Sequence, residues 1–266
     1  IDPDEGVIDV LESVGYAGDA RCYGGDLAVG GVATGAWIDH LDALARDGQL
    51  QACVMGPISG KAMQLAGTLG SVPSYRAVDP AYLLLRSGRL LIAHLTDHVP
   101  LREVSAAITT EAVHRLIVSL SRSLHAWGVG AERIAVAGFN PHAAGDEEKA
   151  SIAPAVAHAR DEGLLVEGPV SPDSVFRQCI EGRYDAVVAM YHDQGHIPIK
   201  TWGFSGNSVL FLGLPYVHCS VAHGTAYDIV GTGTADASMM LNAILDAASL
   251  AVGQGFATIE QDLAHR

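Results

Sequence analysis

The chain alternates short apolar runs with longer segments in which apolar residues recur every three or four positions. The first pattern is typical of strands covered on both faces of a sheet, and the second of amphipathic helices packed on such a sheet. We expect strands at 51–55, 89–95, 133–137, 184–190, 208–212 and 217–221. We expect helices at 34–47, 110–127, 147–162 and 235–252, with Thr34 as a cap of the first, and a short helix that starts at Ser171 and Pro172. Strands that alternate with helices predict an α/β fold with a largely parallel sheet.

The strand expected at 184–190 leads directly into a polar segment that runs from His192 to Lys200. Because Gly195 and Pro198 disfavour a regular helix, we expect a loop here. Gly195 should also prevent His192 and His196 from acting as a pair one helical turn apart. Ligands of open α/β sheets bind beyond the carboxyl ends of strands, so this segment is a candidate site.

A histidine follows the carboxyl end of three expected strands; these residues are His98, His142 and His192. If the strands are parallel neighbours, the imidazoles converge on one edge of the sheet. Three neutral imidazoles and an open position can hold a catalytic divalent metal. Asp97, Asn140 and Asp193 could each orient one ring from the second coordination sphere. A single histidine of this kind is more often an ordinary loop residue, but three at matching positions favour a metal site. His94 lies inside a strand and is expected in the core or a crevice.

A glycine-rich segment, residues 220–236, follows the last expected strand. Glycines permit tight turns and close approach of the backbone to a ligand. Thr225, Asp228 and Asp236 could hydrogen-bond a ribose or an adenine. The segment contains neither G-x-G-x-x-G nor a P-loop motif, so the pattern alone is equally compatible with a plain connection before the last helix.

Composition narrows the class of protein. The 266 residues are 49% hydrophobic, enough for one large domain or two smaller ones. A net charge of −14 argues against a nucleic-acid partner. No apolar run reaches membrane-spanning length and no signal peptide opens the chain, so we expect a cytoplasmic protein. The opening residues do not read like a natural initiation site, and we expect a further N-terminal piece.

Two scarce residue types add detail. The four cysteines are scattered without a C-x-x-C pair and read as buried apolar residues of a reducing compartment; they are Cys22, Cys53, Cys179 and Cys219. Only three lysines occur, at positions 61, 149 and 200. Lys200 follows His192 by eight residues, which makes it a candidate for chemistry as much as a surface residue.

Four motifs together resemble the 4-hydroxythreonine-4-phosphate dehydrogenase family, over about residues 34–252. The motifs are Thr96-Asp-His-Val-Pro-Leu101, Asn140-Pro-His-Ala143, Met190-Tyr-His-Asp-Gln-Gly195 and His223-Gly-Thr-Ala226. The resemblance implies an isocitrate/isopropylmalate dehydrogenase-like fold, with two α/β/α subdomains around an active-site cleft. It also implies an NAD-binding subdomain formed by 1–75 and 198–266, and a metal-binding and dimerisation subdomain formed by 76–197.

The resemblance further implies roles for individual residues. His98, His142 and His192 match the family's ligands for a divalent metal, with zinc ahead of magnesium, manganese or cobalt. In the family these ligands come from both subunits of a homodimer, so a monomer would be inactive. Lys200 matches a substrate-binding lysine and could shuttle a proton, while Asp193 would orient His192. The segment from His223 also looks like the adenosine-binding loop of isopropylmalate dehydrogenases, which implies NAD. Its expected cofactor-binding residues are His223, Gly224, Thr225, Ala226, Asp228, Ile229 and Asp236.

Several positions depart from the family's pattern, mostly in the part that contacts substrate. Val209 stands where the family has an asparagine, His218 where it has an arginine, and Ser71-Val72 where it has a His-Thr pair. Ser71, Val209 and His218 are therefore the candidate substrate-binding residues besides Lys200. The family's motif lysine falls on Gly60, one place before Lys61, its aspartate before the His-Gly-Thr-Ala motif is Ala222, and its first strand and N-terminal glycine-rich motif are missing from this chain. Loss of an arginine weakens the case for a phosphorylated substrate, because arginine suits phosphate geometry.

The function implied is NAD-dependent, metal-dependent oxidation, with decarboxylation, of a small-molecule hydroxy acid. The substrate is either a 4-phosphorylated hydroxy acid or an unphosphorylated carboxylated cis-dihydrodiol, such as a terephthalate dihydrodiol. Two other classes stay open. A non-redox metal enzyme would use the same histidines without NAD affinity, and a non-catalytic relative would bind ligands without turnover.

Overall fold

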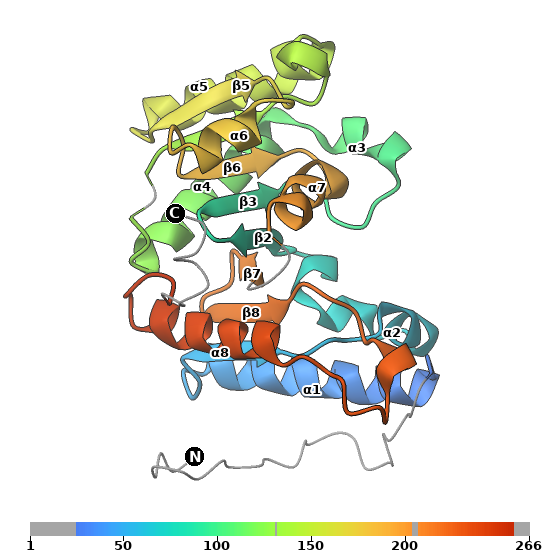
Figure 1. Ribbon diagram of the computed structural model, residues 1–266. Coiled ribbons are helices and arrows are strands. Elements are labelled where there is room, and N and C mark those ends of the chain that lie inside the picture. Colours follow the sequence, from blue (N-terminus) through green and yellow to red (C-terminus); the bar gives the residue numbers. More distant parts are fainter. Residues whose placement is uncertain (1–24, 131, 204–206, 258–266) are drawn as a thin grey trace.

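The computed structural model describes residues 25–130, 132–203 and 207–257, and its centre is one eight-stranded sheet (Figure 1). The strands are β1 (Ala52–Met55), β2 (Tyr82–Ser87), β3 (Leu90–His94), β4 (Ile134–Ala137), β5 (Val166–Val170), β6 (Ala186–Ala189), β7 (Ser208–Leu212) and β8 (Val217–Val221). The α-helices are α1 (Ala28–Arg46), α2 (Gly60–Ala66), α3 (Leu101–Ala107), α4 (Thr110–Ala126), α5 (Ala153–Asp161), α6 (Val175–Ile180), α7 (His192–Trp202) and α8 (Ser238–Ala251). Short 3-10 turns are η1 (Leu69–Ser71), η2 (Pro73–Tyr75), η3 (Pro141–Ala143) and η5 (Tyr227–Ile229), and a π-helical turn is η4 (Glu148–Ile152).

The sheet is mixed: four of its seven neighbouring strand pairs are parallel and three are antiparallel, so the prediction of a largely parallel sheet holds for only part of it. Its strand order is β1-β8-β7-β2-β3-β6-β4-β5. β3, β6, β4 and β5 run parallel, as do β1 and β8, but β2 and β7 pair antiparallel with all of their neighbours. β2 was not predicted at all. Buried strands read as continuous apolar runs whatever their direction, so the apolar pattern could not reveal the reversal.

Helices cover both faces of the sheet and bury two separate apolar clusters. Along α4, Leu116, Ile117 and Leu120 are fully buried and pack with residues of α5 and α8 against one face. On the other face, α1, α2, α6 and α7 contribute Ile38, Met63, Val175 and Ile199. The strands of both predicted subdomains belong to one continuous sheet. The division into two subdomains therefore stays a prediction.

The predicted helices differ from the observed ones mainly at their starts. α1 begins six residues before Thr34, whose hydroxyl donates to the Gly30 carbonyl oxygen at 2.8 Å inside the helix. α6 begins at Val175 rather than at Ser171 and Pro172, because the Ser171 hydroxyl bonds Asp173 instead of capping a helix. The helix expected at 147–162 begins as the π-helical turn η4, and β5 was missed because glycine and proline interrupt its pattern.

The loop expected after β6 is instead the helix α7. The helix passes β3 so closely that a Cβ on Gly195 would lie 2.2 Å from His94 Nε2 and 2.7 Å from Ile92 Cγ2. Pro198 lies within α7 although proline cannot donate the usual backbone hydrogen bond. Packing on the sheet thus overrides the local preference of both residues. His192 and His196 stack one turn apart with ring centroids 3.6 Å apart, so the expectation that Gly195 prevents their pairing was also wrong.

The remaining expectations concern cysteines and membranes. Cys53, Cys179 and Cys219 are free and buried, as predicted, and Cys22 lies outside the described residues. Within the described ranges, each helix is too short or too polar to cross a lipid bilayer.

The crossing of α1 and α2 generates a stability prediction. A Cβ on Gly31 would lie 2.1 Å from the Ala62 carbonyl oxygen, which is backbone and cannot move aside cheaply. We expect Gly31→Ala to lower the free energy of unfolding by about 2–3 kcal/mol, the cost of overpacking a tight contact. Urea denaturation measures this difference.

Gly60→Ala is the matched control, because a Cβ at Gly60 meets nothing within 4 Å. Alanine at this helical position should be neutral or stabilising by up to about 1 kcal/mol. Equal effects of the two substitutions would show that the close crossing of α1 and α2 does not matter.

Candidate metal and cofactor sites

Two of the three predicted metal ligands lie together at one edge of the sheet. β3, β6 and β4 are parallel neighbours, as predicted, so their carboxyl ends lie at the same edge. His98 follows β3, and His192 opens α7 directly after β6. Their ring centroids are 4.9 Å apart, and together with Asp97 they offer ligand atoms within 4.8 Å of one another.

Each of these two rings is paired with the carboxylate of a neighbour in sequence. His98 Nδ1 lies 2.7 Å from Asp97 Oδ1, and His192 Nδ1 lies 2.6 Å from Asp193 Oδ1. The hydrogen bond to Asp97 raises the pKa of His98 above its ordinary value. Pairing through Nδ1 leaves Nε2 as the nitrogen for a metal, the usual arrangement of ligating histidines. Two imidazole nitrogens oriented by carboxylates suit a divalent cation such as zinc, which accepts nitrogen ligands readily.

Two further histidines, which the sequence analysis did not assign to this site, lie under the pair. His196 stacks on His192, and the His94 ring centroid lies 4.8 Å from that of His196. Burial is the main cause that lowers the pKa of His94 to about 3 and that of His196 to about 4. Both rings are therefore neutral at pH 7. Neutral rings can pack beneath metal ligands without repelling a cation. The sequence did contain a sign of this arrangement, because His94 lies four residues before His98 and His196 lies four residues after His192.

His142 is not part of this cluster. Among the described residues, the group that could hold a metal consists of Asp97, His98 and His192. His142 is exposed in η3 with φ 57°, and Ala143 follows with φ 54°, a left-handed conformation that is uncommon for residues other than glycine. We expected Asn140 to orient His142, but its side-chain amide instead donates to Glu147 and Glu148 at 2.8 Å each.

The turn that carries His142 is held by a buried carboxylate. Glu148 is 2% exposed and accepts hydrogen bonds from the backbone N–H groups of Phe139 and Asn140, both at 2.7 Å. Burial opposes ionisation of Glu148, but its hydrogen bonds with Asn140 and Phe139 outweigh this and lower its pKa. Position 145 has no room for a side chain, because a Cβ on Gly145 would lie 2.0 Å from Asn140 Nδ2. Glu148 thus fixes the strained turn and the position of His142.

A second candidate site is a cavity of about 510 Å³ formed by the glycine-rich segment, Pro57 and the start of α8. Six of the seven residues expected to bind the cofactor line it: His223, Gly224, Thr225, Ala226, Ile229 and Asp236. Asp228 is not among the lining residues. The segment is therefore more than a plain connection, and the cavity volume is within the range of small-molecule sites.

The four residues expected to bind substrate lie on different elements. Lys200 is exposed on α7, and Ser71 donates a hydrogen bond to Asp39 of α1 at 3.1 Å. Val209 and His218 are buried on the neighbouring strands β7 and β8. These positions do not form one continuous surface in the chain by itself.

His218 is the most unusual of the four. It is 3% exposed, packs against Phe211 and Tyr216, and neither of its ring nitrogens has a hydrogen-bond partner among the described residues. Burial and the positive charge of Arg76 lower the pKa of His218 to about 4. The side chain is therefore neutral at pH 7 and does not replace the charge of an arginine.

The mixed sheet, its helical layers and the solved structures most like it define an α/β protein with the isocitrate/isopropylmalate dehydrogenase-like fold. Within that class the chain belongs to the family described as "Pyridoxal phosphate biosynthetic protein PdxA", whose family model matches residues 4–247.

Individual relatives agree with this membership. A protein of Novosphingobium aromaticivorans, provisionally named 4-hydroxythreonine-4-phosphate dehydrogenase, is 53% identical over 253 residues, which are 95% of this chain and 76% of the relative. The D-threonate 4-phosphate dehydrogenase of Salmonella typhimurium is 38% identical over 88% of this chain and 73% of its own length. A solved terephthalate 1,2-cis-dihydrodiol dehydrogenase from Burkholderia xenovorans superposes with a TM-score of 0.67 at 30% identity, covering 93% of this chain and 81% of that chain.

The role of Glu148 can be tested through stability. Glu148→Ala leaves two partly buried backbone N–H groups without an acceptor, so we expect the free energy of unfolding at pH 7 to fall by about 1–3 kcal/mol. Because the pKa of Glu148 is lowered in the folded state, its contribution is present above the unfolded pKa near 4.3 and is lost as pH falls through the folded value. The difference between wild type and variant should therefore shrink in urea titrations below about pH 4.

Glu147→Ala is the matched control. Glu147 also accepts a hydrogen bond from the Asn140 amide but bonds no backbone group of the turn in 139–145. Glu147→Ala should lower the free energy of unfolding by less than about 1 kcal/mol. A loss at Glu147 as large as that at Glu148 would contradict the role of Glu148 as the anchor of the turn.

Proposed function

We propose that the chain is an NAD-dependent, divalent-metal-dependent dehydrogenase that oxidises a hydroxy acid and releases carbon dioxide. The observation that carries the proposal is the pair His98 and His192, each backed through Nδ1 by its own carboxylate. The names of the relatives support oxidation of a hydroxyl group. The same cluster without NAD would serve a non-redox enzyme, but the cavity beside His223 favours a cofactor-dependent one.

The residues have separate tasks in this proposal. A divalent metal would lower the pKa of the substrate hydroxyl and polarise the carbonyl that forms, and NAD would accept the hydride. His98 and His192 would hold the metal, with Asp97 and Asp193 fixing their orientation. The glycine-rich cavity would hold the adenosine part of NAD. Lys200 would bind a carboxylate or phosphate of the substrate, or move a proton when the 3-oxo acid loses carbon dioxide.

A second copy of the chain would complete the site. His142 is exposed on a strained turn and lies outside the cluster of His98 and His192. We infer that it serves the cluster of a partner subunit in a homodimer, as the resemblance implies. Zinc is the metal we propose first, because nitrogen-rich donor sets suit it better than magnesium. We place the enzyme in the cytoplasm, in keeping with its free cysteines.

An unphosphorylated diol is a second candidate substrate, and the state of His218 favours it. A neutral, buried histidine replaces an arginine of the family, so this position adds no positive charge for a phosphate. The likeness to a terephthalate dihydrodiol dehydrogenase supports the same alternative.

The metal assignment makes a direct prediction. His98→Ala and His192→Ala should each weaken zinc binding, measured by calorimetry on the metal-free protein, by at least about tenfold, because each removes a ligand. The far-ultraviolet circular dichroism should not change. His125→Ala, on the exposed side of α4, is the control and should bind zinc like the wild type. Zinc binding retained in both cluster variants would refute the site.

Turnover separates the two substrate classes. We expect NADH formation at 340 nm, in the presence of zinc, from one class only: 4-phosphohydroxythreonine and 4-phosphoerythronate, or a carboxylated cis-dihydrodiol. Activity should disappear in His142→Ala and return when that variant is mixed with His98→Ala, because a hybrid dimer contains one intact shared site. No NADH from any of these compounds, with zinc and NAD bound, would contradict the proposed dehydrogenase.

A further inference from the structure

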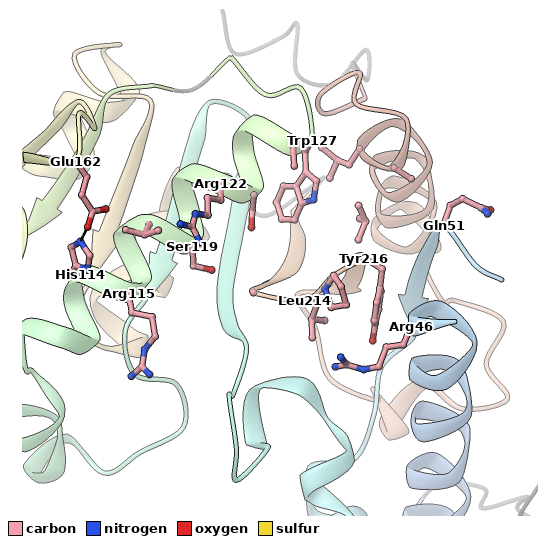
Figure 2. A pocket seen from close by; sticks show the side chains of 18 residues that line it. Arg46, Gln51, His114, Arg115, Ser119, Arg122, Trp127, Glu162, Leu214 and Tyr216 are labelled. Atoms are coloured by element: carbon pink, nitrogen blue, oxygen red, sulfur yellow. Dashed lines mark ion pairs between the residues drawn. The ribbon is translucent and has the colours of Figure 1, made fainter. Parts of the chain in front are cut away.

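A second, larger groove lies at the other end of β8 from the glycine-rich cavity. Its volume is about 990 Å³, and its walls are α4, the turn between β7 and β8, and the final residues of α1 and α8 (Figure 2). It shares no lining residue with the cavity beside His223. The two hollows lie at opposite ends of β8, which has five residues and is therefore roughly 17 Å long at the rise of a strand.

Arginine side chains converge on this groove from two sides. Arg115, Ser119 and Arg122 follow one another on one face of α4, because they are spaced by four and three residues. Arg46 extends toward the hollow from the opposite side, at the end of α1 (Figure 2). Three of the chain's 16 basic residues thus line one groove in a protein whose net charge is −14.

Two of these three arginines, Arg115 and Arg122, have no carboxylate partner within the described part of the chain. Asp42 pairs with Arg46 at 2.8 Å but also with Arg76 at 2.9 Å, and it accepts a hydrogen bond from Tyr216. Arg115 bonds the hydroxyl of Tyr82 rather than a carboxylate. Arg122 has no ion pair or hydrogen bond within the described part of the chain. Asp42 does not itself line the groove, and the acidic residue that does, Glu162, is paired with His114 at 3.1 Å.

We propose that this groove binds a small phosphorylated organic anion at a site separate from the active site. Guanidinium groups match phosphate oxygens with paired hydrogen bonds, and Ser119 and Ser123 add hydroxyl donors on the same wall. Trp127, Leu214 and Leu250 supply apolar surface for the carbon part of the ligand. The volume accommodates a metabolite up to the size of a nucleotide. Because three arginines and one glutamate line it, the groove has an excess of positive charge, which concentrates anions locally.

The test uses Trp127 as a local reporter. In a Trp37→Phe/Trp202→Phe background, Trp127 is the remaining tryptophan and lines the groove. Pyrophosphate and ribose 5-phosphate are titrated into this protein without NAD, because NAD is itself a phosphorylated anion of the class that the groove is proposed to bind. We expect a saturable change in tryptophan emission with ribose 5-phosphate or with both probes, and an affinity that falls as sodium chloride is raised.

Matched variants decide whether the arginines are responsible. Arg115→Ala/Arg122→Ala should weaken the binding by at least about tenfold, because each removes charge-assisted hydrogen bonds. Arg177→Ala/Arg183→Ala removes two exposed arginines from the α6 region and should bind like the parent protein. Equal thermal stability of both pairs excludes unfolding as the cause. The readout needs no turnover, so it stands apart from the proposed dehydrogenase activity.

Three results would overturn the proposal. One is the absence of a saturable change in Trp127 emission with ribose 5-phosphate, whether or not pyrophosphate binds. Another is an affinity that Arg115→Ala/Arg122→Ala leaves unchanged. The third is binding of an oligonucleotide to the groove when neither small probe binds.

Discussion

The candidate metal site depends on one close contact between α7 and β3. At Gly195 the helix backbone lies against the His94 ring and Ile92, at distances that leave no room for a side chain. This contact holds the first turn of α7 on the sheet and places the His192 ring beside that of His98. A larger residue at 195 would push α7 outward, and the two rings would separate. Glycine is present here because of the approach of the sheet, although it weakens the helix taken alone.

Burial and pairing divide the histidines of this site into two kinds. His94 and His196 are kept neutral by burial, whereas His98 and His192 are partly exposed and paired with carboxylates. Each carboxylate comes from a residue adjacent in sequence, Asp97 before His98 and Asp193 after His192, so the pairing needs no long-range structure. Glu148 has a different task, because it satisfies the backbone of the turn that presents His142. The buried groups at this edge, which are the two neutral histidines and Glu148, therefore support the surrounding backbone and rings. The more exposed His98 and His192 are left to bind ligands.

The two hollows at the ends of β8 differ in charge. One end leads into the glycine-rich cavity, and the other begins at the arginine-lined groove. Two concave surfaces of different chemistry thus lie at the two ends of one buried strand.

The sequence by itself determined the α/β class, most of the strands, and the positions of His98 and His192 at strand ends. It could do so because buried strands and amphipathic helices leave local periodic patterns. It also identified the glycine-rich segment, whose turns are local. Only the tertiary structure decided that β2 and β7 run antiparallel, that residues 192–202 are helical, and that His94 and His196 belong to the cluster. These features depend on contacts between segments far apart in sequence, such as Gly195 with His94, and no local pattern records such contacts. The same holds for the arginine groove, since its lining combines residues of α1 and α4 that are far apart in the sequence.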